Sequence, residues 1–128
     1  MSTVTGIDIQ PIDEVAESLA RFGDRYLRRI YGELELEECQ TNDVHLARDL
    51  ALRFAAKEAV LKVLRPHDHI PSWRLIEVLL RHREGPRVVL IGEAEQLARH
   101  NGVERMFLSV SRGRDYAIAT VVADVTMK

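Results

Sequence analysis

The stretch RDLALRFAAKEAVLKVL, from Arg48 to Leu64, decides the fold. Eleven of its last fifteen residues are Leu, Val, Ala or Phe, and neither Gly nor Pro interrupts it. This length and composition favour a helix over a strand. Asp49 or Asn42 can cap its start, and Pro66 ends it. Because apolar residues surround its whole circumference, we expect a central and largely buried helix.

The predicted helix also carries charged side chains, at Arg53, Lys57, Glu58 and Lys62. Charges in a buried helix are costly unless they are paired or hold an ion or a charged ligand. Glu58 and Lys62 lie one turn apart beside small alanine side chains. They could hold a metal and a phosphate side by side, or form an ordinary ion pair on the helix surface.

Length and charge restrict the class of protein. A chain of 128 residues is expected to form one domain, residues 1–128. The net charge of −2 argues against a general nucleic-acid-binding surface. Cys39 is the single cysteine, which excludes a disulfide framework. Neither a signal sequence nor an apolar run of membrane-spanning length is apparent, so we expect a cytoplasmic protein without membrane contact.

The remaining elements predict the α+β class, with a small and mainly antiparallel sheet wrapped around the long central helix. Glu33, Glu35, Glu37 and Glu38 are expected on an exposed acidic helix or turn. Strands are predicted at 4–9, 76–80, 88–91, 106–111 and 116–123, and further helices at 12–22, 25–30 and 92–100.

A second acidic residue, Asp8, lies in the first predicted strand. Gly6 beside it permits close approach of a backbone or a ligand. Asp8 and Glu58 together would offer two carboxylates from separate elements, which suits a hard cation such as Mg²⁺. Lys57 and Lys62 would neutralise phosphate oxygens nearby. The alternative is a Glu58–Lys62 helix pair with an unrelated Asp8.

Two further groups of side chains allow more than one interpretation. The cluster of Arg21, Arg25, Arg28 and Arg29 is either a solvated helix face or a docking patch for an acidic protein. In the loop after the central helix, His67 and His69 are possible metal ligands, although no third ligand is apparent.

The motifs together resemble a known family. Gly6-Ile7-Asp8, followed by RFAAKEAVLK from Arg53 to Lys62, is similar to the 4′-phosphopantetheinyl transferases. The closest likeness is to their short, single-domain branch, the holo-acyl-carrier-protein synthases. Further matches are SWRLIEV at residues 72–78, Gly85-Pro86, and Asp115-Tyr116-Ala117, so the resemblance covers nearly the whole chain.

The resemblance implies a reaction and an assembly. The phosphopantetheine arm of coenzyme A would be transferred to a serine of an apo acyl carrier protein, with release of adenosine 3′,5′-bisphosphate. The resemblance also implies the phosphopantetheinyl transferase fold, a requirement for Mg²⁺, and a homotrimer with active sites at the subunit interfaces.

Site residues follow from the same resemblance. Asp8 and Glu58 would hold Mg²⁺ against the pyrophosphate of coenzyme A, and Lys62 would offset charge on the leaving group. Arg53 and Lys57 would bind or orient the nucleotide. Glu58 is a candidate base, acting directly or through water. The carrier protein would dock on the arginine cluster, chiefly Arg21, Arg25 and Arg28.

The first of two departures from the family pattern follows Lys62. Relatives usually have an aromatic-Gly-Thr-Gly loop there, whereas this chain has Val63-Leu64-Arg65-Pro66. Proline offers no N–H to a phosphate. Either Arg65, His67 or His69 supplies the contact instead, or coenzyme A binds differently or poorly.

The second departure lies in the last hairpin, where Ser111-Arg112-Gly113 replaces a Ser-His-Thr pattern. Arg112 or Arg114 could contact a phosphate of the nucleotide instead. The altered loop after Lys62 leaves an alternative function open. The chain could be a catalytically weak relative that binds coenzyme A or a carrier protein without efficient transfer.

Overall fold

The computed structural model describes residues 1–39 and 45–126. Its strands are β1 (Ser2–Pro11), β2 (Ile76–Leu79), β3 (Arg87–Leu90), β4 (Val103–Arg112) and β5 (Tyr116–Val125). Its helices are α1 (Ile12–Phe22), α2 (Asp24–Ile30), α3 (Glu33–Glu38), α4 (Leu46–Leu64) and α5 (Glu93–His100), and the 3₁₀ turn η1 spans Trp73–Leu75.

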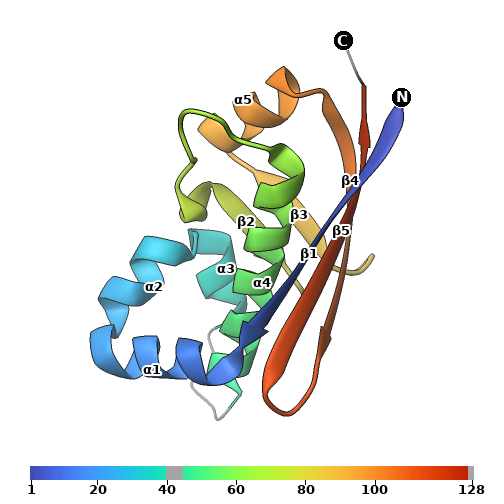
Figure 1. Cartoon of the computed structure of the whole chain (residues 1–128). Helices are drawn as coiled ribbons and strands as arrows, with labels where there is room; N and C mark the ends of the chain where they lie inside the picture. Colours follow the sequence, from blue (N-terminus) through green and yellow to red (C-terminus); the bar gives the residue numbers. More distant parts are fainter. Residues whose placement is uncertain (40–44, 127–128) are drawn as a thin grey trace.

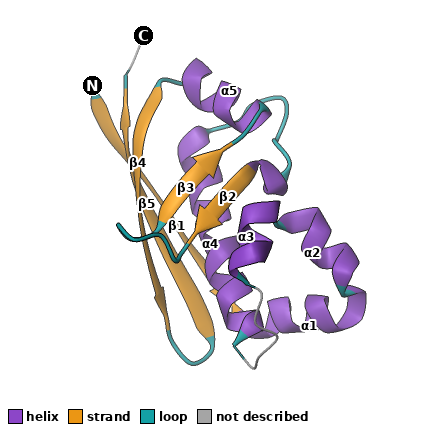
Figure 2. Cartoon of the chain, turned by 180° about the vertical axis from the view of Figure 1, so that it is seen from behind, coloured by secondary structure: helices purple, strands orange, loops and turns teal. Residues whose placement is uncertain are grey.

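The central helix α4 organises the fold, as the sequence predicted (Figure 1). Strands β1, β5 and β4 cover one side of it, and α1, α2, α3 and the β2–β3 hairpin pack around the rest (Figure 2). The helix begins two residues before the predicted start, and His45 precedes it without a capping side-chain hydrogen bond. Asp49 makes ion pairs instead of capping the helix, and Asn42 lies outside the described residues.

The α+β class and the antiparallel pairing are confirmed, but the strands form two sheets rather than one. The larger sheet has the order β1-β5-β4, and β2 pairs only with β3. The face of the larger sheet that points toward α4 is lined by small residues of β5. Among them, Ala117, Ala119 and Ala123 are fully buried. These small side chains let the sheet approach the alanines of α4 closely.

The outer face of the larger sheet carries several large apolar side chains that are exposed in the single chain. Ile7 and Ile9 of β1 are both 57% exposed, and Phe107 of β4 is 58% exposed. Tyr116 and Val122 of β5 complete this outer face. Large apolar side chains gathered on one face commonly mark an interaction surface.

Gly6 fixes how β1 lies on α4. A Cβ atom at this position would be 2.3 Å from the carbonyl oxygen of Ala59, well inside van der Waals contact. Any larger residue would therefore push the strand away from the helix. Because Asp8 follows two residues later on the same face, this contact also sets where the Asp8 carboxylate lies.

Candidate active site

The structure brings together Asp8 of β1 with Glu58 and Lys62 of α4, a group we call the Asp8 site. The Lys62 Nζ atom donates to Asp8 Oδ1 at 3.2 Å and to the Ile7 carbonyl at 2.6 Å. The Asp8 side chain is only 12% exposed, whereas that of Lys62 is 55% exposed. A largely buried carboxylate thus has an accessible ammonium group beside it.

Glu58 has an unusual ionisation in this site. Partial burial is the largest influence, and the neighbouring Asp8 carboxylate and the negative charge of Glu14 add to it, against the opposing charge of Lys62. Together they raise the pKa of Glu58 from 4.5 to about 7. Glu14 lies in the first turn of α1, and no sequence pattern connected it with this site.

The residues of the Asp8 site fit a divalent cation. Asp8 Oδ2 is buried and receives no hydrogen bond from the described residues. Two neighbouring carboxylates that repel one another, with one oxygen left unpaired, are well suited to a hard cation. In the part of the chain that the structure describes, no three His, Cys, Asp or Glu side chains cluster as a metal site. A cation at Asp8 and Glu58 would thus take its other ligands from water and substrate.

A second charged group lies on the opposite side of α4 and is buried. It consists of Lys57 and Arg53 with Glu35, Glu38 and Asp49, and we call it the buried charged cluster. Lys57 Nζ donates to Glu35 Oε1 at 2.6 Å, to the Trp73 carbonyl at 3.0 Å and to the Ile76 carbonyl.

Arg53 is also held by protein acceptors, although its buried Nε–H has no hydrogen-bond partner among the described residues. Its Nη1 atom donates to Glu38 Oε1 at 2.9 Å and to the Val78 carbonyl at 2.7 Å, and Nη2 pairs with Asp49 at 3.4 Å. The side chains of Arg53 and Lys57 are both 0% exposed. Both side chains face α3 and β2 in this arrangement, so the contact of these two residues with the nucleotide stays a prediction that their burial does not favour.

The acidic segment 33–38 forms the predicted helix, but it is not wholly exposed. Glu35 is 0% exposed and also accepts hydrogen bonds from the backbone N–H groups of Gly32 and Val78, both at 3.0 Å. Cys39, directly after α3, lies with its sulfur 3.4 Å from Asp49 Oδ2, and burial raises the pKa of its thiol to about 12. This segment serves to bury the positive charges of α4.

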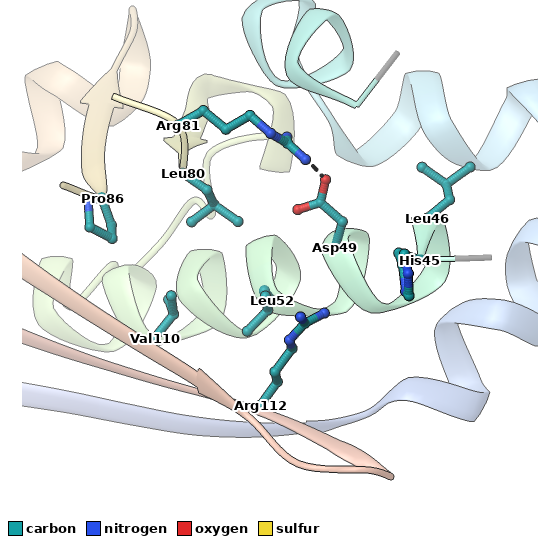
Figure 3. Close-up of a pocket in the computed structure, with 9 residues that line it drawn as sticks. All are labelled: His45, Leu46, Asp49, Leu52, Leu80, Arg81, Pro86, Val110 and Arg112. Atoms are coloured by element: carbon teal, nitrogen blue, oxygen red, sulfur yellow. Dashed lines mark hydrogen bonds and ion pairs between the residues drawn. The ribbon is translucent and has the colours of Figure 1, made fainter. Parts of the chain in front are cut away.

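Arg112 lines a pocket of about 420 Å³ between α4, β4 and the β2–β3 hairpin (Figure 3). Arg81, which the sequence did not single out, faces it from the opposite wall and pairs with Asp49 at 3.4 Å. The Arg81 side chain also donates to the Glu38 carbonyl at 2.6 Å. The remaining lining residues are His45, Leu46, Leu52, Leu80, Pro86 and Val110. This Arg112 pocket combines apolar walls with two cations.

The Arg112 pocket and the Asp8 site lie at opposite edges of the larger sheet. Asp8 belongs to β1 and Arg112 to β4, and β5 separates the two strands. Within one chain, Asp8, Glu58 and Lys62 are thus not among the residues that line the Arg112 pocket.

The structure divides the predicted arginine patch. Arg25 and Arg29 line a groove of about 290 Å³ between α1 and α2, together with the half-exposed Phe22. Arg21 is placed over the Phe22 ring, 5.4 Å from its centre. Arg28 lies elsewhere, because it lines a separate hollow with Glu33, Glu37 and Arg74.

The loop after α4 carries the other predicted contacts. Arg65 is exposed at the end of the helix, and His69 pairs with Glu93 of α5 at 2.9 Å. His67 is exposed in the same loop. None of the described helices is both long and apolar enough to cross a membrane.

Comparison with known proteins assigns the chain to a family. Residues 5–121 match the family model described as the 4′-phosphopantetheinyl transferase superfamily. The holo-[acyl-carrier-protein] synthase of Koribacter versatilis is 40% identical over 121 residues, which cover 94% of this chain and 96% of that protein. The enzyme of the same name from Chlamydia trachomatis is 41% identical over 93% of this chain and 97% of its own length.

Solved structures agree with the sequence comparisons. An ACPS–CoA complex from Chronobacterium ammoniagenes superposes with a TM-score of 0.83 at 32% identity, covering 99% of this chain and all of the other. The holo-[acyl-carrier-protein] synthase of Helicobacter pylori in complex with coenzyme A gives a TM-score of 0.77 at 25% identity, covering 94% and 100% of the two chains. The chain therefore belongs to the 4′-phosphopantetheinyl transferase superfamily.

Proposed function

We propose that this chain, as one phosphopantetheinyl transferase domain over residues 1–128, transfers 4′-phosphopantetheine from coenzyme A to a serine of an apo acyl carrier protein. The other product is adenosine 3′,5′-bisphosphate. The observation that carries the proposal is the pair of adjoining carboxylates, Asp8 and Glu58, with the accessible Lys62 beside them. The names of the relatives and the coenzyme A complexes of its structural neighbours support this choice.

Asp8 and Glu58 would hold Mg²⁺, which supplies positive charge to the pyrophosphate oxygens when bound. Lys62 would contact the same pyrophosphate and offset the negative charge that develops on the leaving bisphosphate. Transfer of a phosphoryl group depends mainly on such positioning and charge neutralisation. Glu58, with its pKa raised to about 7, is suited to accept the serine proton, directly or through water.

The Arg112 pocket is the proposed site for the nucleotide end of coenzyme A. Its volume of about 420 Å³ and its apolar walls suit a base, and Arg81 and Arg112 suit phosphate oxygens. In this assignment Arg81 and Arg112, which face a cavity, contact the nucleotide. They replace Arg53 and Lys57, which are buried.

A homotrimer would unite the two halves of this site. Because the Asp8 site and the Arg112 pocket lie at opposite edges, a head-to-tail contact would bring the Asp8 site of one copy to the Arg112 pocket of the next. Repetition of such a contact closes a ring. The exposed apolar outer face offers the surface that this association would cover.

Sedimentation tests the assembly. The wild-type protein should sediment as a trimer, and Phe107→Glu in the outer face should dissociate it and abolish transfer. The control is Arg99→Glu on α5, an exposed position away from that face. A monomeric wild-type protein with full activity would refute the shared site.

The carrier protein is proposed to dock on the groove between α1 and α2. Arg21, Arg25 and Arg29 would pair with acidic residues of the carrier, and Phe22 would provide apolar contact. The double reversal Arg21→Glu/Arg25→Glu should raise the KM for the carrier at least about tenfold and leave the KM for coenzyme A unchanged. Arg28→Glu should act more weakly, since Arg28 lies outside the groove.

The decisive experiment is intact-mass spectrometry of apo acyl carrier protein incubated with the chain, coenzyme A and Mg²⁺. We expect a mass gain of one phosphopantetheine that EDTA prevents. Asp8→Asn should abolish the gain, and Asp13→Asn, a matched change at an exposed position of α1, should not.

The same experiment tests the alternative of a weak relative. Mg²⁺-dependent binding of coenzyme A without a mass gain on any of several carriers would favour binding without efficient transfer. The cytoplasmic location expected from the sequence stays part of the proposal.

A further inference from the structure

A second hollow adjoins the proposed docking groove on α1. It has a volume of about 230 Å³ and is lined by Glu14, Glu17, Ser18, Arg21 and Phe22, and we call it the acidic hollow. Ser18 and Phe22 also line the groove between α1 and α2, so the two depressions share a wall. A partner that docks in the groove therefore lies against the acidic hollow as well.

The charges along this surface are separated by sign. Glu14 and Glu17 lie at one end, and Arg25 and Arg29 line the groove at the other. All four side chains are exposed, and within residues 1–39 and 45–126 none of them makes a hydrogen bond or an ion pair. Exposed charges that the chain leaves unpaired are available to orient a partner of complementary charge. The docking surface thus has a negative end and a positive end.

The acidic hollow is the end nearer to the Asp8 site. Glu14 lies in the first turn of α1, which begins directly after β1 and leads away from it toward α2 (Figure 1). The negative charge of Glu14 also helps to raise the pKa of Glu58, so these two carboxylates lie close enough to repel each other. The part of a carrier next to its reacting serine would therefore face Glu14 and Glu17, and more distant parts would face the arginines.

We propose that Glu14 and Glu17 determine which carrier protein the chain modifies. The preferred carrier presents a basic side chain next to its modified serine and acidic side chains farther along the same face. The inference rests on the proposed function and deepens it, because it names the charge pattern of the partner. A carrier that is acidic throughout would place like charges against Glu14 and Glu17, which weakens and slows association. The arginines alone could not make this distinction.

Competition between two carriers tests the inference. One apo acyl carrier protein is prepared in two forms that differ at two exposed positions beside the modified serine, with lysines in one form and glutamates in the other. Both forms are mixed with the wild-type chain, coenzyme A and Mg²⁺, and intact-mass spectrometry follows each. We expect the lysine form to be modified about tenfold faster. The ratio compares kcat/KM for the two carriers, so any effect on the chemistry that they share cancels.

Charge reversal in the acidic hollow should remove this preference. Glu14→Lys and Glu17→Lys should each reduce it to about threefold, and the double variant should abolish it. Asp13→Lys is the matched control, because Asp13 is exposed in the same helical turn as Glu14 but lines neither depression. This control should keep the wild-type preference. Melting temperatures close to that of wild type would show that the variants are folded.

The outcomes separate this inference from the proposed function. A wild-type chain that modifies both carriers at the same rate overturns the inference and leaves the proposed function intact. A preference that persists in the double variant, or that Asp13→Lys reduces as much as Glu14→Lys does, also overturns it, because the preference would then not arise in the acidic hollow. A wild-type chain that modifies neither carrier refutes the proposed function itself.

Discussion

Lys57 and Lys62 belong to one motif on one helix, yet their environments are opposite. Lys57 is 0% exposed and donates to three protein acceptors, whereas Lys62 is 55% exposed beside a partly unpaired carboxylate. Five residues along a helix place two side chains on different faces. One lysine therefore joins α4 to α3 and β2, and the other faces the strand that carries Asp8. The motif thus combines a buried, fully paired lysine with an accessible one, to which we assign the proposed catalytic role.

The carboxylates show the same contrast. Glu35 accepts hydrogen bonds from Lys57 and from two backbone N–H groups, although burial still raises its pKa. Burial lowers the pKa of Lys57 in turn. Asp8, by comparison, keeps an oxygen that no described residue bonds. Complete pairing is typical of a structural ion pair, and an unpaired buried oxygen is typical of a site that awaits a ligand.

The largest expected effect is on stability. Lys57→Met leaves the Glu35 carboxylate buried without its partner and should lower the free energy of unfolding by about 3–5 kcal/mol. Lys62→Met removes a half-exposed pair and should cost less than about 1 kcal/mol. Urea unfolding of both variants measures the difference. Equal losses would mean that the two lysines do not have separate roles.

For activity, we expect Lys62→Met to have a larger effect than Lys57→Met. Lys62→Met should reduce kcat about 10²- to 10³-fold, the size of effect seen when one charge-stabilising donor is removed from a transition state. Lys57→Met should retain near-normal kcat per folded molecule at low temperature. The assay is transfer to apo acyl carrier protein, corrected for the folded fraction. A Lys62→Met enzyme of normal kcat would remove this residue from catalysis.

A smaller effect is expected when both buried partners are neutralised. Glu35→Gln added to Lys57→Met removes the uncompensated charge and keeps one acceptor oxygen, which serves the backbone N–H of either Gly32 or Val78. The double variant should recover about 1–3 kcal/mol relative to Lys57→Met alone. Thermal and urea unfolding measure it. No recovery would show that packing, rather than charge, controls this part of the fold.

The smallest effect concerns Glu58 and pH. Its pKa is raised to about 7, so without a cation the folded state holds this proton more tightly than the unfolded state. Stability should therefore fall as pH rises from about 4.5 to about 7, the window between the two pKa values. Glu58→Gln should be more stable than wild type at pH 8 by about 1 kcal/mol or less, and equal to it at pH 4.

Mg²⁺ provides the control for the pH prediction. At pH 8 it should raise the melting temperature of wild type and leave that of Glu58→Gln nearly unchanged. A difference between the variants that does not depend on pH would show that the Glu58 charge is not the cause.

Local signals in the sequence predicted much of the fold. The prediction placed α1 from Ile12 to about Phe22, in agreement with the structure, and α4 within two residues, because proline, glycine and apolar spacing are local features. The strand pattern could not show that β2 and β3 would form a separate sheet. That division depends on how the hairpin packs against α3 and α4.

The site residues that belong to sequence motifs could be predicted. The residues whose surroundings depend on contacts between distant segments could not. The structure brings Asp8, Glu58 and Lys62 together as expected. The burial of Lys57 required its pairing with Glu35, 22 residues away, and helix periodicity alone could not reveal that partner. Arg81 was missed because it meets Arg112 across the pocket only after the hairpin has packed.

The position of Cys39 allows thiol labelling to detect local opening of the buried charged cluster. The chain has a single thiol, and burial raises its pKa to about 12, so almost no thiolate is present near neutral pH. Thiol reagents react with the thiolate. Labelling should therefore be slow in the intact fold and faster when α3 separates from Asp49 and α4. The rate of labelling would time the opening of the buried charged cluster in the native enzyme, without an added probe and independently of turnover.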